Sequence, residues 1–445
     1  MSSQASLALN SMPHQEAQIF MKKYETTMDS KIPIKEKNPI VCLDSISESE
    51  VEPGDSESDP FINLNTRLTD SDGDYKIYHY IVCDDKSENV IKNSRGIIRS
   101  KDEIVCKTFN FTPEFIGINE PNIEAVDSIL SVAKNFSVYM AEEGTLIRLW
   151  FHNNSWHIST HKKLDANRSR WGSKESHGDM FIKSLLWYIK NNLQDKIKLE
   201  DESHVLDVYL STLKQDRVYT FIVRTTIQNR IVCTRNFDPM IYFAGEFGLV
   251  GEDKFVLLND NTSNIERPVK LTFENCTALF HIADNISPKR AQGVMIYYDE
   301  GLPSFGTIKL TSSAYQSLSD IRGNFPSVKF RYLQLRNDPE SVQKLYKLYP
   351  EYYNSFNEYE TIIHGICDKI YEGYKSRYIN HEFTVLPQEL WYVTKDIHDD
   401  YIKDSIKNRI SISLVHQHVN ALSAVRLNYI IRCHYERQNN KNDNL

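Results

Sequence analysis

The chain has 445 residues, of which 40% are hydrophobic and 11% aromatic, and its formal net charge is −8. That length predicts two or three domains with buried cores and excludes a small binding peptide. No window approaches the roughly 20 apolar residues of a membrane span, and the polar N-terminus lacks the apolar stretch of a signal peptide, so no membrane partner is expected.

Cysteine usage indicates the redox compartment, and the distribution of acidic residues bears on nucleic-acid binding. The seven cysteines form no Cys-x-x-Cys pair. Such a scattered, odd set favours free thiols in a reducing compartment, the cytoplasm, over a disulfide framework or a metal site. Residues 44–59 hold seven acids and no base, so removing them from the total of −8 leaves the rest of the chain at −1. The acidic total therefore does not exclude nucleic-acid binding by the remainder.

Residues 1–60 form the first predicted region, a disordered acidic tail. The segment 44–59 is rich in Ser, Glu and Asp and poor in apolar residues, a composition that buries too little surface to fold. We expect a solvated tether there, through which a protein partner could bind. Its acids could also compete with RNA phosphates for a basic groove.

A strand, a turn and a hairpin are predicted further along the chain. Val138–Met140 favours a short strand, and Gly144 permits a tight turn. Thr145–Phe151 and Trp156–Thr160 are β-rich runs separated by four polar or turn-forming residues, which is typical of a hairpin. The turn itself contains Ala141-Glu142-Glu143 immediately before the glycine.

This turn resembles the nucleophile loop of ATP-dependent RNA ligases, a Lys-x-Asp-Gly sequence whose lysine attacks the α-phosphate of a nucleotide. Ala141 stands at the lysine position and Glu143 at the aspartate position. Five other segments resemble motifs of the RNA ligases of T-even phages, in the same order: Ser94-Arg95-Gly96-Ile97-Ile98, Thr160-His161-Lys162-Lys163, Gln228-Asn229-Arg230-Ile231-Val232, Ala291-Gln292-Gly293-Val294 and Thr307-Ile308-Lys309. The resemblance extends over residues 90–320 and is to the covalent nucleotidyltransferase superfamily, as found in phages and large DNA viruses.

The resemblance implies an α+β fold. Residues 61–335 would form a nucleotidyltransferase domain of the RNA ligase, ATP-grasp-like type, with antiparallel sheets. It also implies a nucleotide or RNA as the ligand, and a viral protein that acts in the host cytoplasm.

Four positions depart from the pattern of that family. Ala141 has no amine, so it cannot form the phosphoramidate through which these enzymes transfer a nucleotide. Val223 and Gln292 stand where the family has glutamates, and Thr307 stands where it has the first of two lysines. We therefore expect a pseudoenzyme with no catalytic residue and no metal.

Several cations remain where the family contacts phosphates or RNA. The predicted nucleotide- or RNA-binding residues are Arg95, Glu142, Glu143, Gly144, Lys162, Lys163, Arg230 and Lys309. Only one of the two adjacent lysines can face inward if they lie on a strand, because strand side chains alternate. The alternative for the two glutamates is a pair of turn residues that face water. For each cation the alternative is an ordinary solvated side chain.

Beyond residue 335 the apolar residues recur at helical spacing. Asp338-Pro339 predicts an N-cap with proline in the first turn. One face of a second helix carries Tyr359, Ile362, Ile363, Ile366 and Ile370. A third helix is expected over residues 411–432. We predict a helical C-terminal domain over residues 336–445, whose basic residues, Arg377 and Arg426 among them, either contact RNA or form a polar face.

Three functions fit the sequence. The first is a binding module for a nucleotide, ATP or GTP, or for an RNA 5′ end, and it needs no cofactor. Its sharper variant binds the mRNA cap, because a cationic methylguanine suits an acidic turn with aromatic rings such as Trp150, Trp156 and Trp171 nearby. The second is an active ATP-dependent RNA ligase or nucleotidyltransferase with a non-standard site, which would use Mg²⁺. The third is a protein-interaction scaffold that keeps the fold for its shape.

Overall fold

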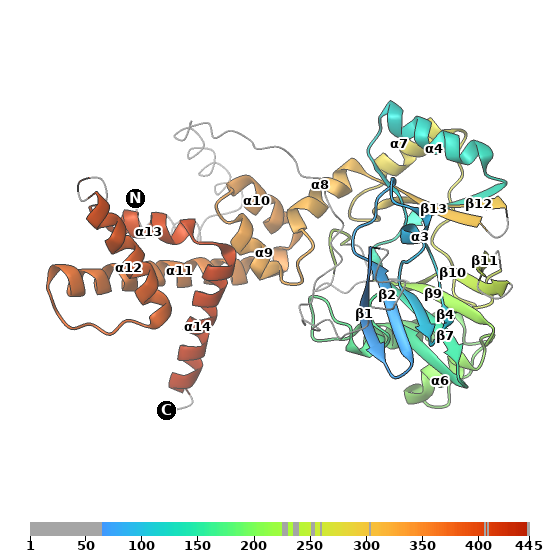
Figure 1. Cartoon of the computed structure of the whole chain (residues 1–445), viewed down its shortest axis with the longest axis horizontal. Coiled ribbons are helices and arrows are strands. Elements are labelled where there is room, and N and C mark those ends of the chain that lie inside the picture. The colour runs from blue at the N-terminus through green and yellow to red at the C-terminus, as the bar shows by residue number, and fades with distance from the viewer. Residues whose placement is uncertain are drawn as a thin grey trace. The chain divides into compact units, whose positions relative to one another are not determined.

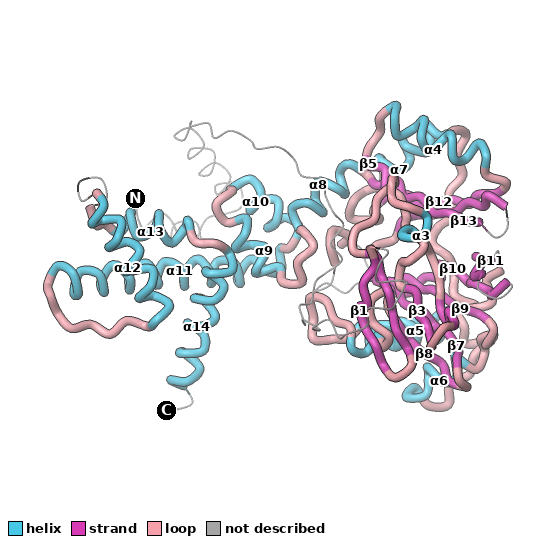
Figure 2. Tube along the Cα trace, in the orientation of Figure 1, coloured by secondary structure: helices cyan, strands magenta, loops and turns pink. Residues whose placement is uncertain are grey.

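A computed structural model of the chain describes residues 65–442, except 225–229, 235–239, 251–253, 259, 302–303, 405 and 407–408 (Figure 1). The predicted acidic tail lies outside the described residues, as do Gln228 and Asn229 of one motif. Strands dominate the part before residue 312, and only helices and turns follow it in the described residues (Figure 2). The predicted mixed fold, with antiparallel sheets and a helical C-terminal region, is confirmed.

The first sheet has four antiparallel strands in the order β1-β2-β3-β4. They are β1 (Thr66–Asp72), β2 (Tyr75–Tyr80), β3 (Ile97–Ser100) and β4 (Glu103–Cys106). Ile77 and Ile98 belong to a buried cluster that also contains Trp150 from the next sheet. Because Arg95-Gly96 directly precedes β3, the packing of this sheet fixes where that motif lies.

The second sheet has five antiparallel strands in the order β11-β10-β9-β7-β8. They are β7 (Gly144–His152), β8 (Ser155–Ser159), β9 (Arg217–Arg224), β10 (Ile241–Val250) and β11 (Lys254–Leu258). The predicted hairpin is confirmed, since Phe151 pairs with Trp156. Asn153 and Asn154 form its turn at φ values of 49° and 58°, a region that asparagine tolerates better than most residues.

The third sheet has the order β5-β13-β12-β6. Its strands are β5 (Glu114–Ile116), β6 (Asn135–Ala141), β12 (Gly293–Gly301) and β13 (Ser304–Thr311). The β5–β13 pair is parallel and the other pairs are antiparallel. Figure 1 shows α4 (Glu120–Val132) and α7 (Cys276–Asn285) together over β12 and β13, and the buried cluster there joins Val126, Leu279 and Ile296.

Helices also cover the second sheet. They are α5 (His177–Asn192) and α6 (Val205–Leu210). Phe181 of α5 and Tyr209 of α6 both pack on Phe221 of β9, with ring centroids 5.7 Å and 6.3 Å away. Three short elements complete this part: α3 (Asn89–Lys92), η2 (Ala166–Arg168) and η3 (Glu202–His204).

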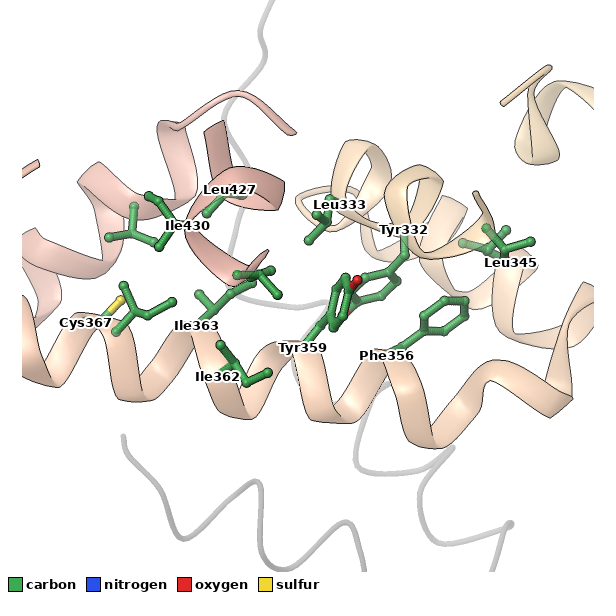
Figure 3. Packing of buried hydrophobic residues seen from close by; sticks show 14 of the residues in the cluster. Tyr332, Leu333, Leu345, Phe356, Tyr359, Ile362, Ile363, Cys367, Leu427 and Ile430 are labelled. Atoms are coloured by element: carbon green, nitrogen blue, oxygen red, sulfur yellow. The ribbon is translucent and has the colours of Figure 1, made fainter. Parts of the chain in front are cut away.

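The helical part has its own core around one long helix, α11 (Tyr353–Tyr374). The other helices and short turns are α8 (Ser313–Arg322), α9 (Val328–Leu335), α10 (Pro339–Leu348), η4 (Pro350–Tyr352), η5 (Lys375–Ile379), α12 (Gln388–Lys403), α13 (Ile412–Ala421) and α14 (Ala424–Asn442). The apolar face predicted for α11 is buried. Figure 3 shows Tyr332 of α9 facing Phe356 of α11, and these rings stack with centroids 4.5 Å apart.

One boundary differs from the sequence expectation and another stays a prediction. After β13, the last strand of the described residues, helices follow from Ser313 onward, and the domain boundary at residue 336 stays a prediction. The single helix predicted over residues 411–432 is wrong, because Leu422 is extended and separates α13 from α14. The hydroxyl of Ser423 then accepts the Arg426 N–H at 3.3 Å, as the N-cap of a new helix, α14. The N-cap predicted at Asp338 is confirmed by the Glu340 N–H, which it accepts at 3.1 Å.

The sequence analysis also expected free thiols and no membrane-spanning segment. The six cysteines in the described residues are free thiols, and Cys42 lies outside that range. No helix there combines the length and apolarity that a membrane span requires. Within the same residues no group of three or more His, Cys, Asp or Glu side chains could hold a metal ion.

Candidate functional site

The third and second sheets are joined in the chain at the turn that carries the ligase resemblance. Strand β6 ends at Ala141 and β7 begins at Gly144, so Glu142-Glu143 is the crossover between the sheets. Gly144 pairs with Arg224 of β9. A Cβ atom at Gly144 would lie 2.4 Å from the carbonyl oxygen of Val223. Glycine is required here by the close approach of a neighbouring strand.

The four positions where the sequence departs from the ligase motifs that it resembles, Ala141, Val223, Gln292 and Thr307, lie in or beside this crossover region or on β13. The Ala141 side chain is 4% exposed, and its carbonyl accepts the Gln292 N–H at 2.9 Å. The Gln292 amide also donates to the Glu142 carbonyl at 3.1 Å. Val223 is buried in the core of the second sheet. The Thr307 hydroxyl lies 2.7 Å from that of Thr112.

Glu142 is a buried carboxylate with two basic partners. The residue is 5% exposed, and its side chain is fully buried. The Arg290 guanidinium donates to it at 2.7 Å, and Arg224 lies 3.7 Å away as a second ion-pair partner. The alternative that Glu142 faces water is wrong, because these guanidiniums replace the water that its charge would otherwise need.

Glu143 is buried as well and holds a neighbouring segment by its backbone. Its carboxylate accepts N–H groups of Ile231, Val232 and Cys233 at 2.6, 2.9 and 3.1 Å. The Tyr315 hydroxyl donates to it at 2.9 Å. Burial, with the charge of Glu143 next, raises the pKa of Tyr315 well above its usual value. The alternative that Glu143 faces water is also wrong, because four hydrogen-bond donors of the protein contact its two carboxylate oxygens.

A group of basic side chains lies where the Arg-Gly segment meets the residues after β8. We call Arg95, Arg148 and His161 the arginine cluster. Arg148 is fully buried and donates to the carbonyl oxygens of Gly96 and Thr160. Gly96 has a φ of +66°, and a Cβ there would lie 2.8 Å from the His161 carbonyl. Two motifs that are distant in the sequence are therefore packed together.

The arginine cluster has no matching negative charge among the described residues. Among the described residues Arg95 donates to the Asn110 carbonyl and the Thr112 hydroxyl alone, at 3.3 and 3.4 Å. The Nε atoms of Arg95 and Arg148 are buried without a hydrogen-bond partner. Burial, followed by the charges of Arg95 and Arg148, holds the pKa of His161 well below its usual value. The local potential is therefore positive.

Two basic residues of this region were missed from the sequence. Arg148 interrupts the apolar run of β7, and that interruption was the signal that could have identified it. Lys107, directly after β4, has a pKa lowered by burial and forms no ion pair with a described carboxylate. Its neighbour Thr108 lies 3.4 Å from the His161 ring nitrogen. No periodic pattern distinguishes Lys107.

The predicted lysines lie in different surroundings. Lys162 and Lys163 lie after the end of β8, in a turn closed by a 2.9 Å hydrogen bond from the Thr160 N–H to the Lys163 carbonyl, so strand alternation does not apply to them. The charge of Lys162 contributes to the lowered pKa of His161, whereas Lys163 pairs with Asp70 at 3.9 Å. Lys309 forms an ion pair with Glu114 at 3.0 Å.

Arg230 lies against the helical part. Its guanidinium donates to the Leu348 carbonyl at 2.8 Å and to Glu351 at 2.7 Å. It also lies over the Tyr349 ring, 4.2 Å from the centroid. Arg230 therefore links the sheets to the helices, and its predicted contact with RNA stays a prediction.

The three tryptophans considered for cap stacking have partners of their own. Trp150 is 1% exposed and stacks on His157 with centroids 4.1 Å apart. Trp156 packs edge-on against Phe151 at 5.5 Å. Trp171 lies under the Arg322 guanidinium at 4.9 Å.

Two open cavities lie at other places in the fold. One of about 870 Å³ is lined by residues 172–175, the start of α5 and Tyr352. The other, of about 690 Å³, lies between β8 and α6. Neither is lined by a predicted binding residue.

Sequence comparison gives viral relatives. No family model matches the chain. It is 28% identical over 297 residues to the immediate-early protein ICP-46 homolog of Invertebrate iridescent virus 6, covering 64% of the chain and 62% of the relative. The homolog from Invertebrate iridescent virus 3 is 26% identical over 314 residues (69% and 64%), and ICP-46 of Frog virus 3 (isolate Goorha) is 27% identical over 230 residues (50% and 55%). These relatives are viral proteins. The chain spans less than two thirds of the length of each.

Structural neighbours are ATP-dependent ligases. A putative DNA ligase from Aquifex aeolicus has a TM-score of 0.35 at 11% identity, covering 76% of this chain and 86% of that one. An archaeal RNA ligase has a TM-score of 0.34 at 10% identity, covering 69% and 77%. A mutant Naegleria gruberi RNA ligase with ATP and Mn has a TM-score of 0.27 at 12% identity, covering 52% and 67%. Superpositions with TM-scores this low carry no argument about chemistry, which has to be argued from the residues of the site.

Proposed function

We propose that the chain binds the phosphates of a nucleotide or of an RNA 5′ end at the arginine cluster, and transfers no nucleotide covalently. The observation that carries this proposal is the pair Arg95 and Arg148, two guanidiniums with buried Nε atoms and no carboxylate partner among the described residues. A buried charge without a counter-charge costs free energy. A phosphate would supply that counter-charge through charge-assisted hydrogen bonds.

The cluster also reaches the third sheet. The Arg95 guanidinium donates to the Thr112 hydroxyl, which lies 2.7 Å from the Thr307 hydroxyl on β13. Thr307 is the position where the ligase resemblance places a lysine. A phosphate at the cluster would therefore lie beside a strand that has exchanged a cation for a neutral hydroxyl.

Covalent chemistry lacks its nucleophile at the crossover. The Ala141 methyl group has no lone pair, and its neighbour Gln292 has no charge. The test is incubation of the full chain with α-labelled ATP or GTP and Mg²⁺, followed by denaturing electrophoresis. No labelled band is expected, and the variant Ala141→Lys should not seal RNA, because Val223, Gln292 and Thr307 still offer no carboxylate or lysine to organise the phosphates.

One observation favours the active-enzyme alternative, and it concerns Lys107. Burial lowers the pKa of this amine, which increases its neutral, nucleophilic fraction. Lys107 directly follows β4, the strand beside the arginine cluster. A labelled band that the variant Lys107→Met abolishes would establish that alternative. A band that persists in Lys107→Met would place the nucleophile elsewhere and would also defeat the non-covalent proposal.

The contacts of the two glutamates favour a phosphate ligand over the mRNA cap. Cap recognition through this turn would need Glu142 or Glu143 to pair with a cationic base. Glu142 already pairs with Arg290, and Glu143 already accepts four hydrogen bonds. We therefore propose a general 5′-phosphate or nucleotide ligand.

Equilibrium binding separates this proposal from the scaffold alternative. Titration of the full chain with ATP, GTP and a 5′-triphosphate RNA should give saturable binding that weakens steeply with salt, because bound phosphates release counterions. Absence of binding to all three at low salt would leave the scaffold. We retain the cytoplasm as the place of action, on the unpaired cysteines, and the acidic tail as the segment for a protein partner.

A further inference from the structure

A second group of arginines and aromatic rings lies in the helical part, on η5, α12 and α14. We call Arg377, Trp391, Tyr392, Arg426, Tyr429 and Arg432 the aromatic–arginine band. The Arg426 guanidinium lies 5.7 Å from the Tyr392 ring centroid and 5.9 Å from that of Tyr429. Arg432 lies 5.7 Å from the same Tyr429 ring. At the other end, Arg377 lies 4.1 Å from the Trp391 ring.

The two tyrosine rings of the band are open to solvent. Tyr392 is 47% exposed and Tyr429 is 41% exposed. The tyrosines of the nearby core differ, since Tyr332 and Tyr374 are almost completely buried. An exposed ring with a guanidinium beside it offers a flat apolar surface and a positive charge at the same place.

The charges of the band are mostly uncompensated. Among the described residues neither Arg377 nor Arg426 forms an ion pair with a carboxylate, and Arg432 has only an exposed partner, Glu436, at 3.5 Å. Glu389 of α12 is buried and forms an ion pair with Arg437. The exposed carboxylate of Asp396 lies one helical turn beyond Tyr392, on the same side of α12.

We infer that the aromatic–arginine band is a binding surface for single-stranded RNA. Bases would stack on the rings of Tyr392 and Tyr429, and phosphates would lie on the guanidiniums, because flat bases alternate with anionic phosphates along the strand. The inference deepens the proposed function and rests on it for the choice of RNA as ligand. It adds a contact that a mononucleotide at the arginine cluster does not use.

The test measures two ligands on the same full-length variants. A 3′-labelled unstructured RNA of about 20 nucleotides, long enough to cover more than one ring, is titrated by fluorescence anisotropy. ATP is titrated separately by calorimetry. Tyr392→Leu and Tyr429→Leu should each weaken RNA binding roughly five- to 150-fold, as expected for one lost base stack, and leave ATP binding unchanged.

Matched variants separate stacking from general damage. Tyr353→Leu changes a 48% exposed tyrosine of α11 whose ring packs on Tyr346 and has no described arginine over it, and this variant should bind RNA like the parent. Tyr392→Phe keeps the ring and should also bind like the parent. Arg426→Gln should weaken binding more than Arg67→Gln, a charge removal on β1.

The outcomes are distinguishable. RNA affinities of Tyr392→Leu and Tyr429→Leu within twofold of Tyr353→Leu would overturn the inference, and intact ATP binding in that case would leave the proposed function standing. Weakened RNA binding in a chain that never bound ATP would support the band and overturn the arginine cluster as the phosphate site. Double-stranded RNA of equal length binding as tightly as single-stranded RNA would show a charge effect without stacking, and would also overturn the inference.

Discussion

The glutamates of the crossover and the arginines of the cluster are charged groups in similar surroundings, but they differ in what neutralises them. Glu142 and Glu143 are 5% and 4% exposed and have internal partners for their charge or their lone pairs. Arg148 is fully buried, and its acceptors in the described part of the chain are two carbonyl oxygens. A buried charge with internal partners is compensated within the fold, whereas one without a counter-charge costs free energy that a ligand of opposite sign would reduce.

The largest effect should come from the carboxylate that the fold uses most. Glu143→Ala would leave the N–H groups of Ile231, Val232 and Cys233 and the Tyr315 hydroxyl without their acceptor. Because each buried unsatisfied group costs about 1–3 kcal/mol, the free energy of unfolding should fall by about 3 kcal/mol or more, measured by urea denaturation.

Two companion variants sharpen that measurement. Glu340→Ala removes an exposed carboxylate of α10 that pairs with Lys344, and should cost less than about 1 kcal/mol. Glu143→Gln keeps one acceptor oxygen and should fall between the two. Equal urea midpoints for Glu143→Ala and Glu340→Ala would show that the Glu143 carboxylate does not hold the 231–233 segment.

An intermediate effect is expected at the arginine cluster. Arg95→Gln should weaken ATP or 5′-phosphorylated RNA binding by about 1–3 kcal/mol, through the loss of a charge-assisted contact. Stability should change little, because Arg95 makes only two long hydrogen bonds. Calorimetry at several salt concentrations measures both the affinity and its salt dependence. Arg67→Gln on β1 is the matched charge removal, and equal losses in both variants would contradict a local site.

A smaller effect should appear in the pH dependence of stability. Burial and the charges of Arg95 and Arg148 keep the pKa of His161 well below its usual 6.5, so the folded chain holds a neutral ring where the unfolded chain takes up a proton. The stability contribution is therefore fully present above pH 6.5 and is lost as the pH falls below it towards the folded pKa. Urea denaturation of the parent and of His161→Asn over this range measures the difference.

A bound phosphate should change this behaviour. Its negative charge would offset the two guanidiniums and raise the pKa of His161, so binding should strengthen as the pH falls through that range. His177 is the internal control, because burial alone lowers its pKa to about 4. Histidine titration by NMR with and without ATP should show a shift for His161 and none for His177. Equal shifts for both would remove the arginine cluster as the phosphate site.

The smallest expected effect is the difference between capped and uncapped RNA. Since Glu142 and Glu143 are already engaged, capped RNA should bind no more tightly than the same RNA with a 5′-triphosphate. Competition of cap analogue against GTP measures this. A clear preference for cap analogue that Glu142→Gln removes would show that this carboxylate leaves Arg290 for the ligand.

Local patterns were sufficient for several elements. The hairpin over β7 and β8 follows from two β-rich runs around Asn153-Asn154, and the buried face of α11 follows from helical spacing. Both depend on neighbours within a few residues. The single helix expected over residues 411–432 was wrong, because Leu422 is extended and Ser423 caps the start of a second helix.

The contacts of the site join residues that are far apart in the sequence. Gly144 was expected to serve a turn, but the Val223 carbonyl of a neighbouring strand is what excludes a side chain. Glu143 was compatible with an exposed turn until the fold placed Tyr315, 172 positions further along the chain, on its carboxylate. Whether a charge has a partner is decided by such contacts, and no spacing in the sequence records them.

The sequence by itself determined that position 141 offers no nucleophilic amine, because alanine carries none in any conformation. It also determined that cations remain at Arg95 and Lys309. Only the tertiary structure decided which charges are already neutralised: Lys309 pairs with Glu114, whereas Arg95 and Arg148 meet no described carboxylate. The physical reason is that a side chain's chemistry belongs to the residue, while its counter-charge and its access to water are set by what packs around it.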